Sequence, residues 1–178
     1  ALRAGEWDIA AELLDEWEMD SDRELVVAPA YQRCRALLAA GRGHGEEAER
    51  WAAETEAAAT ASEVCWELLE ARRARGLAAL LAGAPRTAVE CMAQIWERMA
   101  TEGIEEPGAF PVARDLVEAL HGAGDEEGAR AVAARLRGLA ERQRHPWALA
   151  GAERCEALSA LAADADGGAA ARLEASAA

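Results

Sequence analysis

The sequence contains no lysine and no asparagine, and all 19 of its basic residues are arginines. Against these stand 33 Asp and Glu residues, which give a formal net charge of −14 at pH 7. Phosphate backbones select surfaces rich in Lys and Arg, so this balance argues against a nucleic-acid-binding surface. The missing lysine also excludes a Walker A phosphate-binding loop, because that motif requires a Gly-Lys pair.

Paired cysteines and long apolar runs are missing as well. The cysteines lie 26 to 64 residues apart and form no Cys-x-x-Cys motif; they are Cys34, Cys65, Cys91 and Cys155. This spacing favours buried free thiols in a cytosolic protein. No window approaches the roughly 18 uncharged apolar residues of a membrane-spanning helix, and the first residues have no signal-peptide features. We therefore expect a cytoplasmic protein without a membrane contact.

Large apolar side chains are scarce, and alanine takes their place. The chain of 178 residues has one Phe, one Tyr and six Trp, but 48 alanines. A core built from methyl groups has to bring backbones close together, which packed helices allow and a β-sandwich would not supply. The composition predicts an all-α fold.

The sequence repeats itself with a period of 38–41 residues. Its markers are turn residues that precede acidic or polar helix starts, spaced by 38, 40, 41 and 40; they are Gly5, Gly43, Gly83, Gly124 and Asp164. An alanine stands five residues after each marker: Ala10, Ala48, Ala88, Ala129 and Ala169. Seven residues before the markers stand Ala36, Gly76, Val117 and Ala157. Mostly small residues at two fixed places in each period are typical of closely packed helical hairpins.

Helical periodicity supports this interpretation. An i, i+3, i+4, i+7 stripe starts at the alanine after each marker, for example Ala88, Cys91, Met92 and Ile95. The segments before the markers, about residues 27–41, 62–82, 110–122 and 146–163, are rich in Ala and Leu. We expect helix pairs that stack into an α-solenoid, interrupted by a non-helical connector at residues 103–111 and a break at residues 20–22. The only Phe, Phe110, is expected to anchor the connector in the core.

Four arginines recur ten residues before the markers, with spacings of 40, 41 and 40: Arg33, Arg73, Arg114 and Arg154. Arg114 shares this register less closely, because Leu116 and Leu120 match the earlier repeats after a shift of one residue. In a stacked array such residues form a ladder along one side. The ladder is the candidate site for a partner; alternatively, it is a row of surface or inter-repeat ion pairs with neighbouring Glu side chains.

Other candidate chemistry is sparse. The three histidines stand at or near helix ends without metal-ligand spacing, which indicates polar turn residues; they are His44, His121 and His145. The run Gly41 to Gly45 follows no strand, so it indicates an inter-helix turn and not a phosphate cradle. The six tryptophans either line a ligand groove or fill gaps between helix layers, and we expect the second. The sequence predicts neither catalytic residues nor a bound cofactor or metal.

Several stretches together resemble a known family. The period and small residues resemble a tetratricopeptide-like array, although the standard repeat has 34 residues. More specific are residues 31–41, the run 103–108 leading into 115–120, and residues 145–150 followed by Arg154 and Cys155. They are similar to the helical-repeat middle region of large actinobacterial LuxR-type, ATP-dependent transcriptional regulators. The resemblance implies a right-handed superhelical array of antiparallel helix pairs.

The resemblance also implies a function. Residues 1–178 would be a single helical-repeat domain of a longer protein, whose P-loop ATPase module and DNA-binding helix-turn-helix lie elsewhere. The domain would be a non-catalytic scaffold that senses an effector or contacts other domains or a partner protein. The equivalent helix face of tetratricopeptide arrays lines a concave groove, so the resemblance makes the arginine ladder the candidate site for an acidic peptide or another domain. The main alternative is a stand-alone adaptor of the same fold that binds a partner peptide in this groove. A small helical enzyme is the third class considered.

Overall fold

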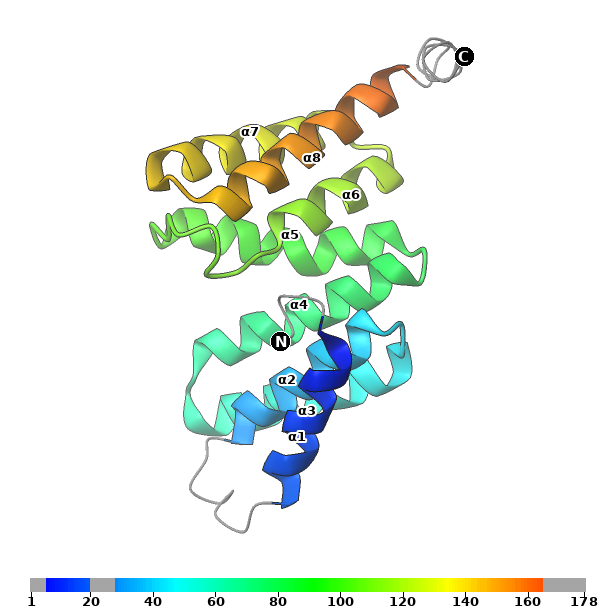
Figure 1. Ribbon diagram of the computed structural model, residues 1–178, viewed down its shortest axis with the longest axis vertical. Helices are drawn as coiled ribbons and strands as arrows, with labels where there is room; N and C mark the ends of the chain where they lie inside the picture. The colour runs from blue at the N-terminus through cyan, green and yellow to red at the C-terminus, as the bar shows by residue number, and fades with distance from the viewer. Residues whose placement is uncertain (1–5, 20–27, 165–178) are drawn as a thin grey trace. The chain divides into compact units, whose positions relative to one another are not determined.

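The computed structural model describes residues 6–19 and 28–164, and within these ranges it contains helices and no strand. The all-α prediction is therefore confirmed for the described part of the chain. The helices are α1 (Trp7–Met19), α2 (Ala28–Gly41), α3 (Gly45–Ser62), α4 (Cys65–Leu81), α5 (Pro85–Thr101), α6 (Ala113–Ala123), α7 (Glu126–Gln143) and α8 (Pro146–Asp164) (Figure 1).

The helix boundaries follow the predicted turns. Gly43, Gly83 and Gly124 have positive φ angles of 77°, 72° and 83°, which glycine adopts without the steric cost of a Cβ atom. After Gly124, Asp125 caps α7 by accepting a hydrogen bond of 2.8 Å from the backbone N–H of Gly128. Asp164, expected to be a turn residue, is instead the last residue of α8.

The chain divides into two compact units. Unit 1 is Ala1–Ile95 and unit 2 is Trp96–Ala178, so the boundary lies within α5. In unit 1, α2 contacts α1, α3 and α4, and α3 also contacts α4 (Figure 1). In unit 2, α6, α7 and α8 contact one another.

Alanines form much of the core of unit 1, as the sequence predicts. Ala36, Ala40, Ala48 and Ala52 are fully buried in one cluster, with Leu37 beside them. At Gly76, an added Cβ would lie 2.7 Å from Met92 Cγ. Backbones approach closely at these small residues, so a larger side chain there would overpack the core.

The connector between α5 and α6 is held by its aromatic residue. Residues 104–112 contain no helix, and Phe110 within them is 1% exposed. Val112, Leu116 and Val117 of the same unit are equally buried. The prediction that Phe110 anchors this loop is confirmed.

Other predicted core positions are confirmed only in part. Trp96 is buried, and three further tryptophans are partly buried and pack against core clusters: Trp7, Trp17 and Trp51. Trp66 and Trp147 are 42% and 37% exposed, so they do not fill the core. All four cysteines are free, as predicted, and Cys155 is buried. Cys65 is exposed, so the prediction of buried thiols is wrong for this residue. Leu13 and Ala157 also lie at the surface, because they fall beside the contact stripes of their helices and not within them.

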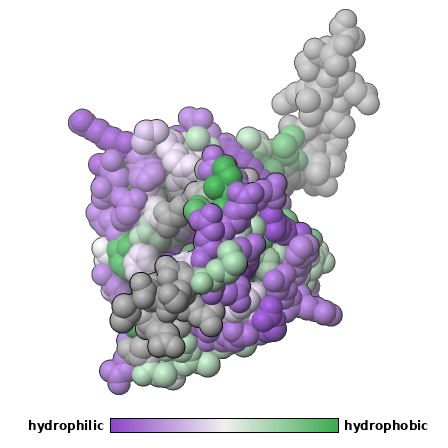
Figure 2. Space-filling model, turned by 60° about the horizontal axis from the view of Figure 1, so that its bottom comes forward, coloured by the Kyte–Doolittle hydropathy of each residue, from purple (hydrophilic) through white to green (hydrophobic). Residues whose placement is uncertain are grey.

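The surface reflects the charged composition. The face drawn in Figure 2 is largely hydrophilic, with small separate apolar patches. Within residues 6–19 and 28–164, no helix is both long and apolar enough to cross a membrane. The predicted break at residues 20–22 and the predicted core position of Ala169 lie outside the described residues.

Candidate functional site

Unit 1 contains a pocket of about 190 Å³ where α1, α2 and α4 meet. Two of the four ladder arginines line it, Arg33 from α2 and Arg73 from α4. They lie at equivalent places in successive periods, and the structure brings them into one cavity. We call this cavity the unit 1 pocket.

Each of these two arginines has a buried carboxylate partner on α4. Arg33 Nη1 lies 3.3 Å from Glu67 Oε1, and Arg73 Nη1 donates a hydrogen bond of 2.7 Å to Glu70 Oε2. The Glu67 and Glu70 side chains are 9% and 4% exposed, less than their arginine partners, and Glu70 itself lines the pocket. The acids therefore hold the two guanidinium groups in place and leave their remaining N–H groups as possible donors to a ligand.

Burial and charge act on the Glu67 carboxyl group. Burial raises its pKa, the nearby Arg33 lowers it and the neighbouring Glu70 raises it again, with a net upward shift. Its second oxygen, Oε2, is buried and accepts no hydrogen bond from the part of the chain that the structure describes. In the pocket wall, burial raises the pKa of the Cys34 thiol, so Cys34 is not an activated nucleophile.

The rest of the pocket wall is apolar. Trp7 reaches it from α1, Trp66 from α4, and Leu37 and Leu77 contribute aliphatic surface. Trp7 is seated on Gly41, where an added Cβ would come within 2.5 Å of its Cη2 atom. The missing Cβ of Gly41 thus leaves room for the Trp7 ring in the pocket wall. The sequence predicted only that Gly41 belongs to an inter-helix turn.

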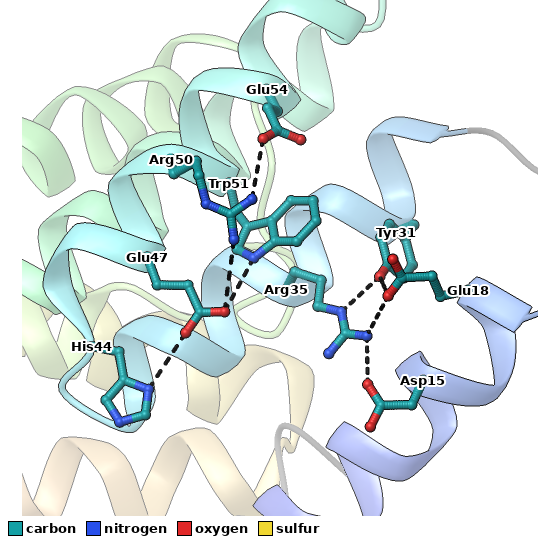
Figure 3. A network of polar contacts seen from close by, with 9 residues as sticks. All are labelled: Asp15, Glu18, Tyr31, Arg35, His44, Glu47, Arg50, Trp51 and Glu54. Atoms are coloured by element: carbon teal, nitrogen blue, oxygen red, sulfur yellow. Dashed lines mark hydrogen bonds and ion pairs between the residues drawn. The ribbon is translucent and has the colours of Figure 1, made fainter.

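A polar and aromatic network beside the pocket fixes α1 onto α2 (Figure 3). Arg35 Nη2 donates to Asp15 Oδ1 at 2.6 Å, and Arg35 Nε donates to the Tyr31 hydroxyl at 2.8 Å. Tyr31 also meets Trp17 and Trp51 edge to face, with ring centroids 5.5 Å and 5.7 Å apart. Because Trp7 belongs to α1, these contacts position one wall of the pocket.

The other two ladder arginines lie in unit 2. The Arg114 guanidinium stacks over the Trp147 ring at 4.4 Å from its centroid, and the Arg114 Nε is buried without a hydrogen-bond partner among the described residues. Arg154 Nη2 donates to Glu118 Oε2 at 2.9 Å. These contacts form the arrangement that we call the unit 2 counterpart, made of Arg114, Glu118, Trp147, Gly151 and Arg154.

The two arrangements share one sequence register. From Gly43 to Gly124 is a shift of 81 residues, and the same shift takes Arg33 to Arg114, Trp66 to Trp147 and Arg73 to Arg154. It also takes Leu37 to Glu118 and Glu70 to Gly151. In unit 2, the carboxylate partner of Arg154 is therefore Glu118 on the neighbouring helix α6. In unit 1, the position equivalent to Glu118 holds the apolar Leu37, and the carboxylate partner of Arg73 is Glu70 on the same helix, α4.

The glycine of unit 2 explains how Arg114 is placed. An added Cβ at Gly151 would come within 2.8 Å of Arg114 Cδ, so the arginine side chain packs directly against α8 at the sequence position that carries Glu70 in unit 1. The same register thus places a pocket beside the arginines of unit 1 and an arginine stacked on a tryptophan in unit 2.

The histidines contribute to contacts near helix ends. His121 Nε2 lies 3.0 Å from Ser159 Oγ, and its Nδ1 lies 2.8 Å from Glu126 Oε2. His145 Nδ1 accepts a hydrogen bond from the Ala148 N–H at the start of α8. Across the described residues, no group of three or more His, Cys, Asp or Glu side chains could hold a metal ion.

Trp7 and Trp66 line the pocket, which matches the groove-lining alternative and not the expected role as core filler, and the sequence did not point to Glu67 or Glu70. The sequence does hold a signal for the tryptophans, because Trp66 and Trp147 each stand seven residues before a ladder arginine.

The chain matches no protein-family model, and no curated protein or solved structure is significantly similar to it.

Proposed function

We propose that this chain is a non-catalytic helical-repeat scaffold of a LuxR-type, ATP-dependent transcriptional regulator. It contacts another domain of the regulator or a partner protein, and ATP binding and DNA binding reside in other domains. The observation that carries the proposal is the unit 1 pocket, because two arginines from equivalent places in successive periods line one cavity together with exposed Trp66. A cavity with apolar walls and a few fixed polar groups is typical of a binding site.

The finer architecture is part of the proposal. We infer antiparallel helix pairs that stack in a right-handed superhelix, with α2, α4, α6 and α8 as the first helices of successive pairs. Two features support it: the period of 38–41 residues and the placing of all four ladder arginines on these helices. In such an array the pocket would open on the groove that the first helices line.

The first experiment is to read the gene around this chain. A Walker A motif upstream and a helix-turn-helix downstream are the expected findings. A reading frame that ends near residue 178 would remove the regulator and leave the adaptor that binds a partner peptide.

The second experiment compares two tryptophans at equivalent places in the full-length protein. Trp66→Ala removes the exposed pocket wall, and Trp147→Ala is the matched control in the unit 2 counterpart. We expect Trp66→Ala to change target-gene activation or partner affinity about tenfold, equivalent to about 1.4 kcal/mol of binding free energy, and Trp147→Ala to change it much less. Equal responses at an unchanged melting temperature would contradict the role of the pocket.

A further inference from the structure

We propose that Ser159 is a reactive serine of unit 2 that takes an acyl group from a thioester or an activated ester. His121 accepts the proton of the Ser159 hydroxyl group, and Glu126 is a positioning residue that acts on His121. The site lies outside the unit 1 pocket and the arginine ladder, so it goes beyond the proposed function and does not depend on it. A scaffold with such a site would carry the acyl group as a covalent modification.

Three helices of unit 2 bring these side chains together. His121 lies in the last turn of α6, Glu126 is the first residue of α7, and Ser159 belongs to α8. The His121 Nε2 atom lies 3.0 Å from Ser159 Oγ, and its Nδ1 atom lies 2.8 Å from Glu126 Oε2. A hydroxyl group, a base within hydrogen-bond reach of it and a carboxylate on the far side of the base are the parts of an activated serine nucleophile.

The helical repeat does not require polar residues at these places. Counted from the turn markers, the equivalent positions in other periods hold alanine or leucine: Ala40, Leu80 and Leu161 for His121, and Leu38, Ala78 and Ala119 for Ser159. Ala40 and Ala119 are fully buried in the core. An apolar side chain therefore satisfies the packing at both positions, and the histidine and serine depart from the pattern together.

The surroundings of the His121 ring suit a base. Its side chain is 13% exposed, and its buried Nδ1 atom meets Glu126 in a close charge contact that is not aligned as a hydrogen bond. The carboxylate favours the tautomer with the proton on Nδ1, so Nε2 accepts the hydrogen bond from the Ser159 hydroxyl group. It also stabilises the imidazolium ion that forms when His121 takes this proton. Catalytic hydrogen bonds commonly align only when the reactant binds.

The proposed step is an acyl transfer. The Ser159 Oγ atom attacks the carbonyl carbon of the donor and forms a C–O bond, while its proton passes to His121 Nε2. The bond between the carbonyl carbon and the leaving group then breaks, and the leaving thiolate or phenolate takes the proton from Nε2. The products are acyl-Ser159, a free thiol or phenol, and neutral His121.

The charge beside the serine favours an acyl donor over a phosphoryl donor. Glu126 is 45% exposed and places its negative charge next to His121. A phosphoryl group would bring further negative charge towards this carboxylate, whereas the carbonyl group of a thioester or ester carries none. Ser159 is half-buried, so a small acyl group such as acetyl is the appropriate probe.

The experiment treats the whole chain with p-nitrophenyl acetate and follows the release of p-nitrophenol. Every sample carries Cys65→Ala, which removes the exposed thiol, and the chain has no lysine whose amine would compete for the probe. Ser159→Ala should lower the initial rate at least about tenfold, because a positioned base contributes roughly 100-fold or more. Peptide mass spectrometry after an acid quench locates the acetyl group. An unchanged rate in Ser159→Ala, or an acetyl group on His121 and not on Ser159, would overturn the proposal.

Variants of the base separate chemistry from packing. His121→Ala copies Ala40 of the repeat, and His121→Gln keeps a hydrogen-bond partner for Ser159 but is not a base. Both should lower the rate as much as Ser159→Ala does, with melting temperatures close to that of the parent chain. Glu126→Gln should also lower the rate, and Glu126→Asp should retain more of it. A rate that His121→Gln leaves unchanged would show that His121 has only a structural role.

Discussion

The two units use the same register of arginines and tryptophans in opposite ways. In unit 2, Arg114 lies over Trp147 with a buried Nε that has no hydrogen-bond partner among the described residues, and Arg154 pairs with Glu118 at the surface. In unit 1, Arg33 and Arg73 pair with the buried Glu67 and Glu70, and a cavity lies beside them. The second arginine of each unit shows the difference most clearly, because its carboxylate partner lies on another helix in unit 2 and on the same helix in unit 1.

The comparison has a physical basis in desolvation. The Arg154–Glu118 pair lies at the surface, where an ion pair contributes about 0–1 kcal/mol. The Glu70 carboxylate is almost completely buried, so it depends on Arg73 to compensate its lost hydration. The Arg73–Glu70 pair therefore carries a desolvation cost that the exposed Arg154–Glu118 pair does not.

The largest expected effect is the loss of the buried acid at position 70. Glu70→Leu should lower the free energy of unfolding by about 3 kcal/mol, because it leaves the mostly buried Arg73 guanidinium without its carboxylate. Chemical denaturation measures this loss. Glu70→Gln keeps a hydrogen-bond acceptor and should cost less; if Glu70→Leu is neutral, the acid does not hold Arg73.

A smaller loss is expected at the glycine that seats Trp7. Gly41→Ala should cost about 1–3 kcal/mol and displace Trp7 from the pocket, since the new Cβ would overlap its ring. Gly45→Ala is the control, because an added Cβ there meets nothing within 4 Å. Thermal unfolding should separate the two variants, and equal melting temperatures would show that Gly41 does not support the pocket wall.

The pH dependence of stability tests the buried Glu67. Its pKa is raised in the folded state, so the folded protein binds more protons than the unfolded chain, and this contribution to stability falls as pH rises through the folded pKa. Wild type should therefore lose stability relative to Glu67→Gln as pH rises above the usual carboxyl pKa of about 4.3. Denaturant midpoints measured on both sides of that pH give the difference, and a constant difference would contradict the raised pKa of Glu67.

The smallest effect is expected in the unit 2 counterpart. Glu118→Leu gives unit 2 the residue of unit 1 and breaks only an exposed ion pair, so the unfolding free energy should change by about 1 kcal/mol or less. The matched comparison is Glu70→Leu. A larger loss for Glu118→Leu than for Glu70→Leu would reverse the comparison between the units.

The sequence predicts the helices well because their signals are local. The turn glycines, the alanines that follow them and the apolar stripes all act within one or two turns of chain, and the observed helices lie where these patterns place them. Phe110 could be placed in the core because the connector around it holds few other large apolar side chains.

The state of each arginine could not be predicted in the same way. Whether a ladder arginine faces a cavity depends on which residue a neighbouring helix places opposite it, such as Leu37 or Glu118, and on whether its own helix supplies Glu70 or Gly151. The first of these is a contact between periods; the second, the Glu70–Arg73 pair, is local, but its burial depends on how the neighbouring helices pack. The exposure of Trp66 and Trp147 was missed for the same reason, since their surroundings depend on the arginine of the preceding period.

The most direct test of the comparison between the units is an NMR relaxation measurement of the arginine Nε–Hε groups. The Arg73 side chain should be markedly more rigid than that of Arg154, because its partner Glu70 is 4% exposed whereas the partner of Arg154, Glu118, is 45% exposed. Equal order parameters at the two arginines would contradict the account.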